Sequence, residues 1–171
     1  MLIPTLETDR LLLQPPGEAG WEAYERFYTD AQASEMYGGP LTVRQAWARL
    51  ASDLGTWYLQ GFGVWLIRRK EDGSYIGTCG FWQGKGWPRE LTWWLLPSAR
   101  GLGLAKEASR AAIGHGYEGF GWDAVQTYMK DENEPARMLV LSLGGTEIER
   151  RTFPDGLERS VYLLPRSRAA A

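Results

Sequence analysis

A strand that runs through a glycine-containing turn into a helix is the feature that most restricts the fold of this chain. Residues 89–96 are rich in aromatic and aliphatic side chains, which is typical of a buried strand. Pro97 ends this run, and the turn Arg100–Gly103 leads into a helical pattern with leucine and alanines on one face. Small residues there allow close packing of the helix on a sheet. The segment therefore predicts a mixed α/β domain.

Hydrophobic periodicity predicts the remaining elements. The expected strands span residues 10–14, 62–69, 75–82, 89–96, 123–129, 146–151 and 159–164. Helices are expected over 18–28, after Thr42, after Gly103 and after Asn133. The order β-α-α-β-β-β-α-β-α-β-β describes one domain over residues 1–171, with a tail, 166–171, that we expect to fray.

Composition excludes several classes of protein. A formal net charge of −2 and a pI of about 5.5 give no electrostatic reason to bind nucleic acid. The single cysteine, Cys79, and the single histidine, His115, exclude a disulfide framework and a metal site of several such ligands. We expect no metal and no membrane partner, because no uncharged run is long and apolar enough to span a bilayer. The expected compartment is the cytoplasm, since the start of the chain lacks a secretory signal.

The turn Arg100–Ala105 has the features of an anion site. Backbone N–H groups converge there beside the positive end of a helix dipole. Gly101 and Gly103 would let a phosphate approach the backbone, and Arg100 adds a positive charge. The turn lacks the Gly-Lys-Ser/Thr of a nucleotide P-loop, and Lys106 occupies the place of the third glycine of a dinucleotide fingerprint. The structural alternative is an ordinary glycine-rich connection.

Three motifs in this chain occur together in one known family. The pattern E-x-G-Y-x-L-x-P-x-x-R-G-x-G-x-A-x-E-A is matched by Glu90, Trp93, Leu95, Pro97, Arg100, Gly101, Gly103, Ala105, Glu107 and Ala108. The pattern N-x-x-A/S-x-x-L-x-x-x-L-G-F is matched by Asn133, Ala136, Leu139, Leu143 and Gly144. Residues 8–13 match a T-x-R-L-x-L start. Over nearly its whole length the chain resembles the GNAT superfamily of N-acetyltransferases, and within it the RimJ/RimL-like branch.

The resemblance implies a splayed central sheet, with acetyl-CoA in the cleft where two adjacent strands separate. Backbone groups of Leu95 and Leu96 would bind the pantetheine arm. The pyrophosphate would be held by the backbone N–H groups of Arg100, Gly101, Leu102, Gly103, Leu104 and Ala105. Asn133 would contact the cofactor or a site water, although a helix N-cap is its plain structural role.

The resemblance also implies a reaction, the direct attack of a neutral amine on the thioester carbonyl in a ternary complex. Glu90 is the candidate general base, acting through water, because it aligns with the family's glutamate at the start of the central strand. Alternation places the side chains of Glu90, Thr92, Trp94 and Leu96 on one face of that strand. The structural alternatives are that Glu90 ends a strand in solvent or pairs with Arg89.

The chain departs from the family pattern at two positions. Val140 stands where the superfamily often has a tyrosine general acid, so the acid is unassigned, and Tyr128 is a candidate without support. Gly145 replaces the usual phenylalanine, which should affect packing more than chemistry. The missing tyrosine supports an alternative function, a non-catalytic acyl-CoA-binding or regulatory protein of the same fold. The retained Glu90 argues against that alternative.

The acceptor is expected to be a primary amine, on a small molecule or at a protein N-terminus. The loop Asp30–Leu41 and the hairpin near Phe153–Gly156 should build its side of the site. Trp82, Trp87 and Trp94 would add an aromatic wall, which favours an acceptor with some apolar surface. The expected assembly is a monomer or a homodimer.

Overall fold

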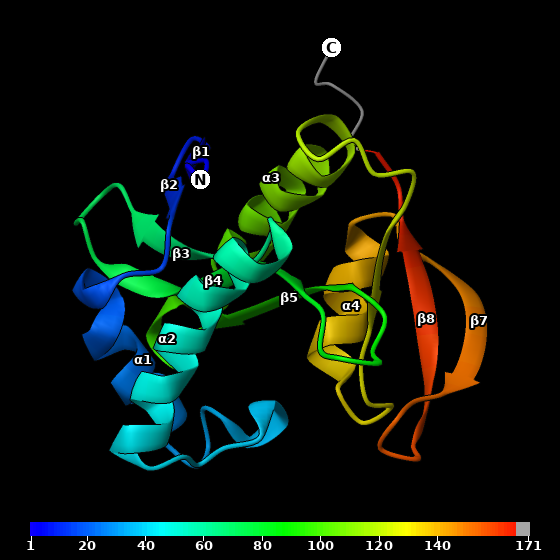
Figure 1. Cartoon of the computed structure of the whole chain (residues 1–171), viewed down its shortest axis with the longest axis horizontal. Helices are drawn as coiled ribbons and strands as arrows, with labels where there is room; N and C mark the ends of the chain where they lie inside the picture. Colours follow the sequence, from blue (N-terminus) through cyan, green and yellow to red (C-terminus); the bar gives the residue numbers. More distant parts are fainter. Residues whose placement is uncertain (167–171) are drawn as a thin grey trace.

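Two separate antiparallel sheets carry the fold of residues 1–166, which the computed structural model describes (Figure 1). The first sheet has the order β1 (Leu6–Glu7), β2 (Leu11–Gln14), β3 (Val64–Arg69), β4 (Tyr75–Trp82) and β5 (Glu90–Leu95). The second has the order β6 (Val125–Tyr128), β8 (Glu158–Leu164) and β7 (Thr146–Thr152). The mixed α/β class is confirmed. Of the tail that we expect to fray, 166–171, residues 167–171 lie outside the described residues.

The helices follow the order that the sequence predicts, and two of them begin at a side-chain cap. They are α1 (Trp21–Tyr28), α2 (Val43–Gln60), α3 (Leu104–Glu118) and α4 (Glu134–Ser142), with short 3-10 turns at Glu18–Gly20, Glu35–Tyr37 and Pro97–Ala99. Thr42 and Gln45 form the expected capping box before α2, each side chain bonding the other residue's backbone N–H. In the described residues, no helix has the length and apolar character needed to cross a bilayer.

Helices cover both faces of the first sheet. On one face, α3 packs its alanines Ala108 and Ala112, both fully buried, against Trp65 and Leu91 of the sheet. On the other face, α1 and α2 enclose Leu66 and the indole of Trp94. In Figure 1, α1 and α2 lie with this sheet on one side of the molecule, and α4 lies with β7 and β8 on the other. Because both faces are covered, β3 is apolar and buried from Val64 to Ile67.

The two sheets meet at β5 and β6 without forming a common ladder. At one end side chains of β6 bridge the gap: Thr127 donates to the Leu91 carbonyl at 2.7 Å, and Tyr128 donates to the Pro88 carbonyl at 2.9 Å. The strands are not paired along their length. The expected splay of the central sheet is therefore confirmed, and it lies between β5 and β6.

Candidate active site

The turn before α3 exposes backbone N–H groups at a helix N-terminus. Gly101 and Gly103 adopt left-handed φ values of 79° and 76°, which side chains rarely tolerate. Gly103 is the N-cap of α3 and has no side chain to accept a hydrogen bond from the first helical turn. A Cβ at Gly101 would meet no atom within 4 Å. The turn is thus open at the N-terminus of α3, which is the geometry that the predicted anion site requires.

Glu107 ties this turn to the start of the chain. Its carboxylate accepts hydrogen bonds from the Thr8 hydroxyl at 2.6 Å and from Nε and the backbone N–H of Arg10 at 2.7 and 3.0 Å. Arg10 also donates through Nη1 to the Leu102 carbonyl at 2.8 Å. Burial alone would raise the pKa of Glu107, but these hydrogen bonds outweigh it and lower that pKa. Two motifs far apart in the sequence thus hold one turn.

The side chain of Arg100 connects the end of β5 to the loop that follows α1. Its Nε donates to the Leu95 carbonyl at 3.2 Å, and its Nη2 donates to the Ala33 carbonyl at 3.3 Å. Its backbone N–H donates to the Pro97 carbonyl at 3.2 Å. This corrects the prediction that the Arg100 N–H is available to a pyrophosphate. The open N–H groups begin after Arg100.

A cavity of about 560 Å³, which we name the turn cavity, lies against this segment. Its lining includes these residues of the predicted cofactor set: Leu95, Arg100, Gly101, Gly103, Leu104, Ala105 and Asn133. The volume lies in the range of small-molecule sites. Most of the predicted set is therefore gathered at one place.

Leu96 differs from the prediction, and the side chain of Leu102 lies outside the turn cavity. The Leu96 N–H donates to the Ile76 carbonyl, and its own carbonyl accepts from the Ala99 N–H, so both groups are engaged inside the protein. Its side chain packs with α1 and α2. The Leu102 carbonyl accepts from Arg10, and neither leucine lines the turn cavity.

The backbone groups that face the cleft belong to Trp93 and Leu95. Because Leu96 bonds β4, the alternation of an antiparallel strand turns the backbone groups of Leu95 and Trp93 to the opposite edge of β5. The carbonyl of Leu91 confirms this direction, since it accepts from Thr127 on β6. Successive residues of β5 direct their backbone groups alternately toward β4 and toward β6. The spacing of residues in the sequence does not reveal which of the two sets faces β4, so Trp93 was missed.

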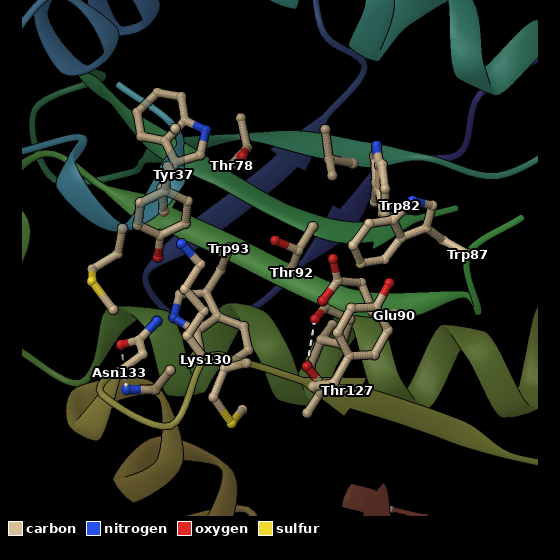
Figure 2. Close-up of a pocket in the computed structure, with 18 of the residues that line it drawn as sticks. Tyr37, Thr78, Trp82, Trp87, Glu90, Thr92, Trp93, Thr127, Lys130 and Asn133 are labelled. Atoms are coloured by element: carbon tan, nitrogen blue, oxygen red, sulfur yellow. Dashed lines mark hydrogen bonds between the residues drawn. The ribbon is translucent and has the colours of Figure 1, made fainter. Parts of the chain in front are cut away.

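A second cavity of about 550 Å³, which we name the sheet cavity, lies over β4 and β5. Figure 2 shows Glu90 and Thr92 of β5 along it, with Trp82 and Trp87 near Glu90 and with Tyr37, Lys130 and Asn133 toward the other end. The two cavities adjoin. The residues that line both are Met36, Tyr37, Trp93, Asn133 and Ala136.

Glu90 stands in the sheet cavity in an apolar environment. Burial raises the pKa of its carboxyl well above the ordinary glutamate value, and the nearby Arg159 guanidinium only partly opposes this shift. Arg159 is itself paired with Asp155, at 2.9 and 2.7 Å. Arg89 lies over the ring of Trp122, 3.4 Å from its centroid. Neither alternative for Glu90, a solvated strand end or a pair with Arg89, describes this arrangement.

The junction of the cavities holds an amide and a hydroxyl. Asn133 caps α4, its Oδ1 accepting from the Ala136 N–H at 3.3 Å, and it also lines both cavities. Tyr37, from the loop before α2, packs its ring against Phe27. Burial raises the pKa of Tyr37 to about 12, so its hydroxyl keeps its proton. Apart from its place in the expected acceptor loop, no local pattern indicates a role for Tyr37.

The other hydroxyl candidates are positioned differently. Val140 is fully buried and lines neither cavity. Tyr128 lines the sheet cavity but donates to the Pro88 carbonyl, and burial strongly raises its pKa. Of the expected acceptor segments, the loop reaches the sheet cavity through Met36, Tyr37 and Gly38. Phe153 of the hairpin instead packs behind Trp87 and Tyr128.

Cys79 and His115 take no part in either cavity. The Cys79 thiol is buried beside the Ser109 hydroxyl at 3.7 Å, and burial raises its pKa to about 12. The His115 ring packs against Trp65 and Phe120. Within residues 1–166, no three histidine, cysteine or acidic side chains cluster as metal ligands.

The split sheet, with a glycine turn and a cavity that holds Glu90 at the split, defines an acyl-CoA-dependent acetyltransferase. The chain belongs to the GNAT family, because residues 10–146 match the model of the acetyltransferase (GNAT) domain. It is 25% identical over 148 residues to the uncharacterised N-acetyltransferase YoaA of Bacillus subtilis (strain 168), covering 84% of this chain and 83% of that protein.

Two solved structures share the fold. An acetyltransferase from Agrobacterium tumefaciens str. C58 is 30% identical, with a TM-score of 0.86 over 96% of each chain. RimL, a ribosomal L7/L12 alpha-N-protein acetyltransferase solved in complex with coenzyme A, has a TM-score of 0.74 at 11% identity, covering 94% of this chain and 97% of its own. At that identity the likeness to RimL concerns the fold.

Proposed function

We propose that this protein is an N-acetyltransferase of the RimJ/RimL-like branch that moves an acetyl group from acetyl-CoA to a primary amine. The acceptor is a small-molecule amine or a protein N-terminus, and the amine attacks directly in a ternary complex. One observation carries the proposal: the glycine turn and the aromatic cavity that holds Glu90 open onto a common junction. RimL, which shares the fold, binds coenzyme A.

The turn cavity fits the cofactor. Backbone N–H groups from Gly101 to Ala105 would hold the pyrophosphate, because α3 provides no side-chain cap of its own. Trp93 and the N–H of Leu95, whose carbonyl accepts from Arg100, would offer backbone groups to the pantetheine arm along the edge of β5 that faces β6. Asn133 would contact the cofactor through its amide nitrogen. Acetyl-CoA supplies a thioester whose carbonyl carbon forms the new C–N bond while the C–S bond breaks.

Glu90 would accept the proton that the attacking amine loses, through a water molecule. A carboxylate whose pKa is raised by burial is a stronger base than a solvated one. Trp82 and Trp87 flank the same part of the cavity and limit its exposure to water. The base and the aromatic wall therefore act on the same substrate amine.

Tyr37 is the hydroxyl that we assign to the leaving thiolate. It lines both cavities, so it stands at the junction where the acyl group would pass between them. Its proton would go to the thiolate sulfur, the role that Val140 cannot fill. This assignment removes the main support for the non-catalytic alternative, which was the lack of an acid.

The test compares acetyl-CoA binding and turnover. Calorimetry should show that Gly103→Trp abolishes acetyl-CoA binding, because the new side chain enters the turn cavity. Gly121→Trp is the matched control: Gly121 has a left-handed φ of 70° and open space, but it lines neither cavity. Release of free thiol is then measured with a panel of primary amines.

Each outcome decides between functions. Binding by the wild type and the control, with thiol release for some amine, establishes the enzyme. Binding without thiol release for any amine favours the regulatory alternative. A wild type that does not bind acetyl-CoA contradicts the cofactor assignment and the mechanism with it.

A further inference from the structure

The indole of Trp94 carries a buried donor without a protein partner. Trp94 is 3% exposed, and no acceptor among residues 1–166 lies within hydrogen-bonding distance of its Nε1. Leaving a buried N–H unpaired is unfavourable, because the group has lost its hydrogen bonds to water. Trp94 also lines the sheet cavity. An indole N–H is a donor only, so the group that pairs with it must be a hydrogen-bond acceptor.

Packing fixes this indole rigidly. Its ring stacks on Phe27 at 4.2 Å between centroids and meets the edges of Tyr24 and Tyr28 at 5.3 and 5.5 Å. The indole cannot turn toward another partner without repacking the core between β5 and α1. The donor is therefore held at one fixed position in a residue that lines the cavity.

The two tyrosines bring charged groups of α2 to the same end of the cavity. Tyr24 donates to the Asp53 carboxylate at 2.8 Å, and Tyr28 accepts from Nη1 of Arg49 at 3.4 Å. Both Asp53 and Arg49 line the sheet cavity. Arg49 makes no salt bridge within the described residues, whereas Asp53 is already bonded. The end near Trp94 therefore offers a second donor, and a cationic one.

Hydrogen-bonding groups line the cavity floor from this end to Glu90. Cross-strand pairs on one face of β4 and β5 are Thr78 with Trp94, Gly80 with Thr92, and Trp82 with Glu90. The hydroxyls of Thr78 and Thr92 line the cavity between the proposed base and the indole. Four residues of strand separate the Cα atoms of Glu90 and Trp94 by about 13 Å. The floor suits an extended substrate with polar groups at both ends.

We propose that the acceptor is an amine whose chain carries a carbonyl or carboxylate oxygen several bonds from the reacting nitrogen, and that Nε1 of Trp94 donates to that oxygen. Arg49 reinforces the contact, most strongly for a carboxylate. This inference rests on the proposed function. It excludes simple alkylamines and polyamines as the preferred acceptors, because they cannot accept from the indole.

The first test uses three amines of matched length: hexylamine, ε-aminocaproamide and ε-aminocaproate. For the wild type, kcat/KM should be larger for the two oxygen-bearing amines than for hexylamine. Trp94→Phe keeps an aromatic ring but removes the donor, so the ratio of kcat/KM for the amide over hexylamine should fall about fivefold to tenfold, mainly through KM. Trp47→Phe, on the exposed part of α2 and outside both cavities, is the control that should keep the ratio.

Arg49→Gln separates the two oxygen sources. Because a carboxylate gains most from the Arg49 guanidinium, this change should lower the ratio for ε-aminocaproate more than the ratio for the amide. Equal losses for the two amines would contradict a contact between Arg49 and the substrate carboxylate. A ratio that Trp94→Phe leaves unchanged overturns the proposal.

A second measurement does not depend on turnover. The indole N–H resonance of Trp94, assigned by its loss in Trp94→Phe, should shift when ε-aminocaproamide is added in the presence of coenzyme A, and not with hexylamine. Equal shifts with both amines, or none with either, contradict the proposal. This resonance could shift as expected while no amine causes release of free thiol. That result would support the contact between Trp94 and the amine and contradict the proposed catalysis.

Discussion

Arg10 and Glu107 form a salt bridge in which Nε of the arginine lies 2.7 Å from the carboxylate of the glutamate. The same arginine donates to the Leu102 carbonyl, so the ion pair positions the turn that precedes α3. Both residues lie in motifs shared with the family, nearly a hundred positions apart. Their contact explains why the two motifs occur together.

Glu107→Gln should weaken this connection. The variant loses charge-assisted hydrogen bonds from Thr8 and Arg10, and we expect a loss of about 1–2 kcal/mol in the free energy of unfolding at neutral pH. The folded state lowers the pKa of Glu107, so its contribution is present above the ordinary glutamate pKa and disappears as the pH falls through the lowered value. Urea unfolding of both proteins at several pH values measures this. A difference that grows toward acid pH would contradict it.

Glu90→Gln should lower kcat about a hundredfold. Because burial disfavours the charged carboxyl, the amide should leave the unfolding temperature unchanged or raise it. On the acid side, log(kcat/KM) of the wild type should fall with slope two, one proton each for Glu90 and the amine, and with slope one in the variant. Glu22→Gln, at an exposed position of α1, is the control. An unchanged slope would remove Glu90 from the mechanism.

Tyr37→Phe should lower kcat about tenfold, at the lower end of general acid effects, because a thiolate leaves readily even without an acid. The affinity for acetyl-CoA should change little, since the ring and its packing on Phe27 remain. Steady-state kinetics and calorimetry separate the two effects. Tyr58→Phe, which alters a surface tyrosine of α2, should change neither quantity. Equal activity of the two variants would show that Tyr37 is not the general acid and that water protonates the leaving thiolate.

Asp53→Asn should stabilise the protein at neutral pH. Burial raises the pKa of Asp53 to about 6, against the opposing effects of the Tyr24 hydrogen bond and the Arg49 charge. The folded state therefore binds this proton more tightly than the unfolded chain, and the wild type loses stability as the pH rises from about 4 to about 6. We expect the variant to gain on the order of 1–2 kcal/mol above about pH 7 and nothing near pH 4. The free energies of unfolding of the wild type and of Asp53→Asn, measured across this pH range, test the prediction. A difference between the two proteins that does not grow with pH would contradict it.

Local patterns predicted most of the fold. The strand β4 has the predicted bounds, 75–82, because its aromatic and β-branched run lies between clear turn signals. The capping boxes and caps at Thr42 and Asn133 also formed as predicted. The strand β1 was missed, since two residues are too few to show a period and their pairing with β2 depends on a turn.

The site was predicted less completely, because its details depend on contacts between distant segments. The bond from Arg100 to the Ala33 carbonyl spans 67 positions and has no local pattern. The engagement of Leu96 follows from the register between β4 and β5, which one strand's sequence does not determine. Tyr37 reaches the junction only because its loop folds across both cavities.

The gap between β5 and β6 is closed by side chains such as Thr127 and Tyr128, and no backbone ladder spans it. A ladder sets the spacing of two strands at about 4.8 Å along their whole length. Contacts between side chains impose no such spacing, because their length depends on the side chains that make them. Each contact can therefore be changed by one substitution. Natural variation or directed evolution can thus change the width of the cleft one residue at a time, and the register of neither sheet has to move.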